Sequence, residues 1–150
     1  RAALALMLAE SGDAETAAAT ARRTLVAASE AFPADSPALA RIRVTVGAAA
    51  REAGDARPAV MLLASGQAGL AGALGEAHPE TVAARVSLAE ILLSPDRDAP
   101  SDALEVLRQV TAVRGQGLSN GRRAAMEFAD ASPGYLHVEA AWAVAQDQID

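Results

Sequence analysis

Apolar residues recur along this chain at spacings of three and four positions, which is the period of an amphipathic α-helix. Val46 and Ala50 belong to one such stripe, and Leu88 and Leu92 belong to another. No long run alternates between apolar and polar residues, as a half-buried β-strand would require. The pattern predicts an all-α protein in which each helix buries one face against a neighbour.

Capping residues mark where these helices begin. A polar side chain ahead of a helix accepts a hydrogen bond from a first-turn amide, and proline is favoured at the first helical position. The capping residues are Asp13, the pairs Ser36-Pro37, His78-Pro79 and Ser132-Pro133, and Asp102 with Glu105 at capping-box spacing. The predicted helices cover roughly residues 1–11, 13–31, 37–53, 56–73, 79–93, 102–114 and 133–148.

The same pattern of residues returns 42 positions further along the chain. The matching pairs are Pro37 and Pro79, Arg43 and Arg85, Val46 and Leu88, Gly47 and Ala89, and Gly12-Asp13 and Gly54-Asp55. A fixed period of about 20–50 residues is typical of repeat proteins, in which a helical hairpin buries its apolar face by stacking on the next. We therefore expect a single domain, an α-solenoid of antiparallel helix hairpins with repeats at about 1–36, 37–78, 79–132 and 133–150.

Two segments interrupt the period. Residues 94–101 contain two prolines and three charged residues, so we expect this insertion to be exposed and mobile. Pro79 and Pro133 are 54 positions apart, 12 more than the period, and the surplus falls in 115–132. Within that segment, 121–130 is expected either to form an extra short helix or to extend the preceding one.

The first residues of the chain match the second half of a repeat's first helix. The places of Arg43, Val44, Val46 and Gly47 are filled by Arg1, Ala2, Leu4 and Ala5. We therefore expect the chain to be a piece of a longer protein, with about half of this first helix lying upstream.

Composition narrows the classes of function. Every basic residue is arginine, the formal net charge is −6 and aromatic residues make up 3%, so a nucleic-acid-binding surface is not expected. The absence of cysteine excludes disulfides and thiolate metal sites, and it fits a reducing, cytoplasmic location. The 18 uncharged residues from Pro58 to Gly75 approach the length of a membrane span, but Ser65, Gln67 and the leading proline favour a repeat helix.

The link between the second and third repeats has a distinctive sequence, Gly75-Glu76-Ala77-His78-Pro79-Glu80-Thr81. Around it recur a Val46-Gly47 pair in a first helix, small residues at Ala17, Ala59 and Ala103, and large apolar residues at Leu63 and Leu107. This pattern resembles the tetratricopeptide repeat (TPR) family, in the 42-residue variety found in kinesin light chains and many bacterial signalling proteins. The resemblance implies a right-handed superhelix with a concave groove that is lined by the first helix of each hairpin.

The resemblance also supplies candidate partner-binding residues in that groove. They are Arg41, Val44, Arg51, Val86 and Glu90, spaced so that each set lies on one face of its helix. Peptide-binding members of the family carry asparagine, lysine or arginine at fixed groove positions, whereas this chain has Ala2, Val44, Val86 and Ala140. The carboxylate clamp of chaperone-binding members is therefore missing, which favours a partner that packs as a helix or a domain.

Arg1, Arg43 and Arg85 recur at the start of the apolar stripe. One interpretation is a basic ladder for an acidic partner. We favour the other, in which the aliphatic stems pack beside neighbouring helices and the guanidinium groups stay in water.

No arrangement of side chains in the sequence predicts catalysis, a cofactor or a metal site. His78 lies at a helix start, where we expect it to act as a cap, and His137 has no second ligand at metal-site spacing. No serine lies in a nucleophile elbow, and no glycine-rich segment carries the lysine of a phosphate loop.

The sequence therefore favours a non-catalytic protein–protein interaction scaffold. We expect it to be part of a larger signalling or regulatory protein of bacterial origin. The expected partner is a protein or peptide, not a nucleic acid or a membrane. Two alternatives stay open: a purely structural repeat domain that packs on neighbouring domains of its own chain, and an enzyme with an unrecognised site.

Overall fold

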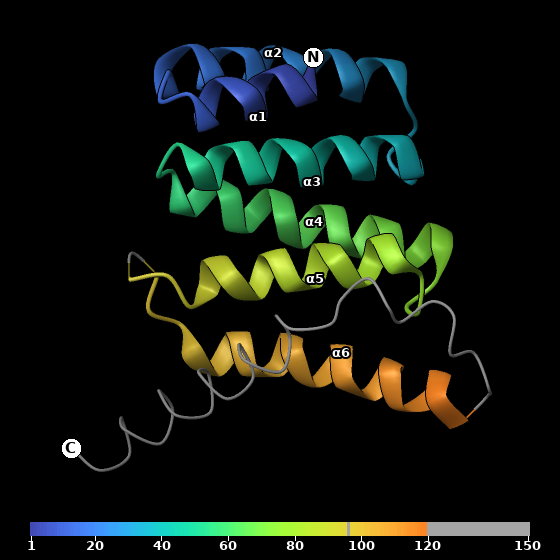
Figure 1. Cartoon of the computed structure of the whole chain (residues 1–150). Helices are drawn as coiled ribbons and strands as arrows, with labels where there is room; N and C mark the ends of the chain where they lie inside the picture. The colour runs from blue at the N-terminus through green and yellow to red at the C-terminus, as the bar shows by residue number, and fades with distance from the viewer. Residues whose placement is uncertain (96, 120–150) are drawn as a thin grey trace. The chain divides into compact units, whose positions relative to one another are not determined.

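The computed structural model describes residues 1–95 and 97–119, and this part of the chain is helical, without a strand. Its helices are α1 (Ala2–Glu10), α2 (Ala14–Ala31), α3 (Pro37–Glu52), α4 (Ala56–Leu74), α5 (Pro79–Leu92) and α6 (Pro100–Ser119), as Figure 1 shows. The all-α prediction is confirmed, and the ends of α1 to α5 lie within one residue of the predicted ones. The helix predicted over 133–148 and the segment 121–130 lie outside the described residues.

Side-chain caps hold the beginnings of three helices, as predicted. The accepting atoms are Asp13 Oδ1, Ser36 Oγ and His78 Nδ1, which lie 3.1, 3.2 and 3.3 Å from the amide nitrogens of Thr16, Ala38 and Glu80. Each bond satisfies an amide that has no partner within its own helix. The starts of α2, α3 and α5 are therefore set by residues next to them in the sequence.

The chain forms two compact units, one from Arg1 to Gly75 and one that begins at Glu76. Unit 1 contains the hairpins α1–α2 and α3–α4, and α3 packs against both helices of the first hairpin (Figure 1). In unit 2, α5 packs against α6. Within unit 1, the second hairpin thus covers one face of the first.

The turns inside the two hairpins of unit 1 have the same geometry. Gly12 and Gly54 adopt φ values of +87° and +79°, a left-handed conformation that glycine tolerates best. Each turn also has the two reversed hydrogen bonds of a Schellman cap. They run from the amides of Gly12 and Asp13 to the carbonyls of Ala9 and Leu8, and from Gly54 and Asp55 to Arg51 and Ala50.

The turn between α5 and α6 is two residues longer. The amide of Ala99 reaches the carbonyl of Leu92 at 3.0 Å, whereas Asp55 closes the equivalent bond to Ala50 at 2.8 Å. Leu92 follows Ala50 by 42 positions, but Ala99 follows Asp55 by 44. Two extra residues are therefore absorbed before α6 begins.

The predicted boundaries of α6 are wrong at both ends. The helix begins at Pro100 instead of residue 102, so Asp102 lies inside the first turn and does not cap it. It also continues to Ser119, through residues that were expected to interrupt the period. Arg97 and Asp98 are exposed, as predicted for the insertion, whereas Pro100 is buried and is already the first residue of α6.

Helices α3 and α4 cross at very short distance. A Cβ atom on Gly66 would lie 2.7 Å from Val44 Cγ2, and one on Gly47 would lie 2.9 Å from Leu63 Cγ. Only a glycine permits such an approach, because ordinary Cβ contacts are longer. Two of the small residues that recur in the sequence, Ala59 of α4 and Ala103 of α6, are fully buried.

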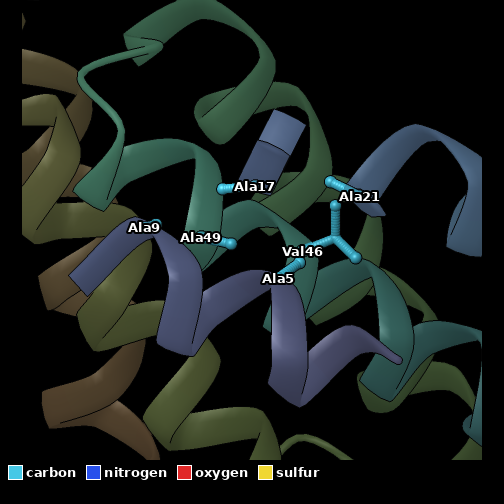
Figure 2. Close-up of a cluster of buried hydrophobic side chains, with 6 residues drawn as sticks. All are labelled: Ala5, Ala9, Ala17, Ala21, Val46 and Ala49. Atoms are coloured by element: carbon cyan, nitrogen blue, oxygen red, sulfur yellow. The ribbon is translucent and has the colours of Figure 1, made fainter. Parts of the chain in front are cut away.

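Alanines form the contact between the two hairpins of unit 1. Its buried residues are Ala5 and Ala9 of α1, Ala17 and Ala21 of α2, and Val46 and Ala49 of α3. Figure 2 shows Val46 as the largest of them, with its branched side chain lying between Ala5 and Ala21. Small side chains let the three helices approach closely, and larger apolar residues such as Leu6, Leu25 and Leu62 pack around the cluster.

The long uncharged stretch predicted to be a repeat helix is α4. It packs against α3 in the hairpin. Within residues 1–95 and 97–119, no helix is both long and apolar enough to cross a membrane.

Candidate functional site

Three of the predicted partner-binding residues lie on α3 in unit 1. Arg41 is exposed and Val44 and Arg51 are half-buried, with half-buried Ala48 between the last two. Spacings of three, four and three place all four on one face of the helix. This α3 row (Arg41, Val44, Ala48 and Arg51) therefore has a cation at each end and small apolar side chains between them.

Val44 is committed in part to the fold. Its Cγ2 lies 2.7 Å from the place that a Cβ on Gly66 would occupy, so the side chain packs against α4. The remaining surface is available to a partner, since the residue is only half-buried. Within the row, Val44 therefore serves both the hairpin and the candidate surface.

Arg51 is held by its neighbour in the sequence. Its Nη2 and Nε atoms donate to Oε1 of Glu52 at 2.9 and 3.2 Å. Both side chains are about a third exposed, at 30% and 38%, so the pair adds only a fraction of a kcal/mol, about 0–1, to stability. Its main effect is to orient the guanidinium near the C-terminal end of α3, where a cation is favoured.

The other two predicted residues, Val86 and Glu90, lie on α5 in unit 2. Both are half-buried, and a spacing of four puts them on one face of the helix. The structure thus brings Arg41, Val44 and Arg51 together on one helix and Val86 and Glu90 on another, in separate units.

Arg85 departs from the interpretation that we favoured for the arginine series. Only 5% of the residue is exposed, and its Nη2 atom forms an ion pair with Oε2 of Glu76. The guanidinium is therefore largely removed from water. Burying a cation is costly, and the carboxylate of Glu76 compensates part of that cost. Arg43 is half-buried and Arg1 is exposed, so the three positions do not form a uniform ladder.

Sequence reasoning missed this ion pair for a clear reason. Glu76 belongs to the link before α5, nine positions ahead of Arg85, and such a spacing is not a helical one. The acidic residue in the Gly75–Thr81 link was the only hint of a partner. The pair ties the link to α5 within unit 2.

Two hollows open on unit 1. The first is lined by alanines of α2 and α3 and by Pro58 and Leu62 of α4, and it holds about 140 Å³. That is smaller than the roughly 300–1,000 Å³ of typical small-molecule sites. The second holds about 480 Å³ and lies between the start of α1, the end of α2 and α3.

One face of α1 is apolar and uncovered. Leu4 is 51% exposed and Met7 is 64% exposed. The residues 42 positions later, Val46 and Ala49, are 1% and 2% exposed, because they pack against the preceding hairpin. Equivalent positions of the repeat thus have opposite surroundings in the two hairpins.

His78 fulfils its predicted role as a helix cap, whereas His137 lies outside the described residues. Among the side chains that the structure describes, no group of three or more histidine, aspartate or glutamate residues is placed to hold a metal ion.

No protein-family model matches this chain, and no curated protein matches it either. The likeness to TPR proteins therefore depends on the residues quoted above, and what it implies about function is a proposal.

Proposed function

We propose that this chain is a non-catalytic protein-binding module of the TPR type, a right-handed α-solenoid from a larger signalling or regulatory protein. The observation that carries the proposal is the recurrence after 42 residues of one hairpin turn, with the same glycine conformation and the same pair of hydrogen bonds. A hairpin that is copied and stacked generates surface along its length instead of a closed pocket. Such surfaces bind other proteins.

The α3 row is the part of this surface that we assign to the partner. Arg41 and Arg51 are ten positions apart, which corresponds to about 15 Å along a helix. Ala48 and the exposed part of Val44 lie between them. A partner helix with two carboxylates at a similar separation and a small apolar face between them fits this arrangement.

The interaction is expected to be of modest strength. Hot spots in protein interfaces are usually tryptophan, tyrosine or arginine, and aromatic residues make up only 3% of this chain. Arg41 and Arg51 are the main candidates for such hot spots in the row. We expect a dissociation constant on the order of micromolar.

The test is a charge reversal with a matched control. A partner captured by the chain is identified, purified and titrated against the parent, against Arg41→Glu/Arg51→Glu and against Arg23→Glu/Arg57→Glu. The control pair changes charge equally on exposed positions of α2 and α4. We expect the first variant to weaken binding by about tenfold or more, because each salt bridge becomes a like-charge contact.

The control variant should bind within about twofold of the parent, and both variants should keep the helical circular dichroism spectrum. If Arg23→Glu/Arg57→Glu weakens binding and the α3 variant does not, the exposed faces of α2 and α4 are the binding surface and the assignment of the α3 row is wrong.

The exposed face of α1 favours a second candidate function, that of a structural domain packed on another part of its own polypeptide. Leu4 and Met7 occupy positions that are buried between hairpins elsewhere in unit 1. If this is the whole function, the α3 variant should not weaken binding of any separate partner. The variant Leu4→Glu/Met7→Glu should instead make the full-length protein more sensitive to limited proteolysis.

A further inference from the structure

The smaller hollow of unit 1 is enclosed by α2, α3 and α4. Its buried lining residues belong to the cluster drawn in Figure 2 and are Ala17, Ala21, Val46 and Ala49. Ala50 and Leu62 also line it and are half-buried, so the hollow opens to the surface. Alanine side chains end at Cβ, and the walls that they form are therefore apolar with space left between them.

The size of the hollow matches one aromatic ring. It holds about 140 Å³. An apolar cavity of about 150 Å³ binds benzene, and a phenylalanine side chain carries a ring of that size. The hollow is smaller than a typical site for a whole ligand, but it is large enough for the ring of a single side chain.

Two charged residues stand at the rim on opposite walls. Arg22 belongs to α2 and Asp55 to the start of α4, and both are exposed. A group that enters the apolar interior thus passes between a cation and an anion.

The side chain of Asp55 does not cap its helix, unlike its counterpart in the first hairpin. That counterpart, Asp13, accepts a hydrogen bond from the amide of Thr16. The position 42 residues after Thr16 is Pro58, and proline has no amide hydrogen to donate. Asp55 accordingly makes no side-chain cap bond. Its exposed carboxylate remains at the rim, where it can pair with a cation from another molecule.

We propose that the hollow anchors one phenylalanine-sized side chain of a partner protein, and that a basic residue beside it in the partner pairs with Asp55. Anchors of protein interfaces are large side chains that fill a pocket, and aromatic residues make up only 3% of this chain. Arg22 repels a second cation and so directs the basic residue to the α4 wall. The net charge of −6 also favours the approach of a basic segment.

This site is separate from the α3 row. Val46 follows Val44 of the row by two positions, which is about 200° around a helix, so the hollow lies on nearly the opposite side of α3. Each of the two surfaces can therefore be tested, and can fail, without the other.

Disulfide exchange tests the proposal on the chain itself. The chain has no cysteine, so Ala53→Cys places a single thiol in the wall of the hollow. This protein is equilibrated in a redox buffer with three thiol probes, the mercaptopropionyl-capped dipeptide amides Phe-Arg, Ala-Arg and Phe-Glu. Mass spectrometry then gives the share of the protein that carries each probe.

We expect the Phe-Arg probe to be held about tenfold more strongly than the Ala-Arg probe, because the hollow buries the phenyl ring. It should also be held about threefold more strongly than the Phe-Glu probe, because the arginine pairs with Asp55. In Ala53→Cys/Asp55→Asn the second preference should disappear and the first should stay, since asparagine suits a helix start as well as aspartate does.

The matched control is Ala68→Cys, which places the thiol on an exposed position of α4 that lines neither hollow. There the three probes should be held equally. The proposal is overturned if the Phe-Arg and Ala-Arg probes are held equally in Ala53→Cys, or if Ala68→Cys shows the same preference for the ring. If the preference for Phe-Arg over Phe-Glu survives Asp55→Asn, the assignment of a basic partner to Asp55 is wrong.

A second copy of the chain is the competing occupant, because 39% of Phe32 is exposed. A dimer in sedimentation that Phe32→Ala dissociates would show that Phe32 of another copy fills the hollow, and it would overturn the proposal of a separate partner. If Ala53→Cys does not fold, as judged by circular dichroism, Ala18→Cys presents the thiol from the α2 wall.

Discussion

At the scale of single residues, glycines and alanines decide how closely the helices of unit 1 approach. Gly47 and Gly66 lie where any side chain would meet the opposite helix, while Gly72, on the same helix as Gly66, has nothing within 4 Å of an added Cβ. The two glycines of α4 thus affect stability in different ways. Gly66 is required by packing against α3, whereas Gly72 makes no such contact and only lowers the helix propensity.

The substitutions Gly66→Ala and Gly72→Ala should therefore have opposite effects on the free energy of unfolding. Gly66→Ala places a methyl group 3.0 Å from the Ala40 carbonyl oxygen and from the Val44 amide, so we expect a loss of about 1–3 kcal/mol from overpacking. Gly72→Ala meets no neighbour and should gain about 0.5–1 kcal/mol through helix propensity. Urea unfolding followed by circular dichroism measures both free energies. If both variants are equally destabilised, the close contact between α3 and α4 does not explain the loss at Gly66.

At the scale of helices, α1 and α3 carry the same pattern in different surroundings. The α3 residue Val46 is enclosed by alanines of the first hairpin, whereas its counterpart Leu4 on α1 is half exposed. Hydrophobic residues at equal places in the repeat therefore contribute unequally to stability.

Truncation of each residue to alanine should show this difference. Val46→Ala removes two methyl groups from a buried site between the hairpins and should cost about 1–3 kcal/mol. Leu4→Ala removes more atoms but from an exposed position, and should change stability by no more than about 0.5 kcal/mol. Equal losses in chemical denaturation would show that the face of α1 is covered in solution.

The helices also show what local sequence can and cannot predict. The starts of α2, α3 and α5 were predictable because a capping side chain stands beside each of them. The start of α6 was not, because Asp102 and Glu105 have the spacing of a capping box although the helix begins two residues earlier. A local pattern of this kind is overridden when the preceding turn closes elsewhere, here through the bond from Ala99 to Leu92.

The candidate site was predictable only in part. Helical spacing placed Arg41, Val44 and Arg51 on one face of α3, but it gave no indication that Val44 also leans on Gly66. This contact depends on how α3 and α4 cross, and the spacing of residues within one helix carries no information about that crossing. The burial of Arg85 was missed for the same reason, since its partner Glu76 lies outside the helix.

At the scale of the whole molecule, the 42-residue period governs the backbone as well as the side chains. Pro37 and Pro79 each begin a helix, and Asp13 and Asp55 each follow the glycine of a Schellman turn. Equivalent substitutions in different repeats should then have equivalent costs wherever the surroundings are alike.

The two turn glycines provide that comparison. An added Cβ meets nothing within 4 Å at Gly12 or Gly54, so the cost of alanine is that of the left-handed backbone alone. We expect Gly12→Ala and Gly54→Ala each to lose about 1–2 kcal/mol. The matched substitutions to asparagine, which tolerates this conformation better, should lose clearly less. A large difference between the two alanine variants in thermal unfolding would argue against equivalent repeats.

The longer turn before α6 has a practical consequence for altering the chain. It accommodates two additional residues, and yet Ala103 and Leu107 of α6 stay fully buried in unit 2. Lengthening an exposed connection costs little in loop-closure entropy. The neighbourhood of Arg97 and Asp98 is therefore the place to insert an epitope tag, a fluorophore site or a protease cleavage sequence without repacking the helices on either side.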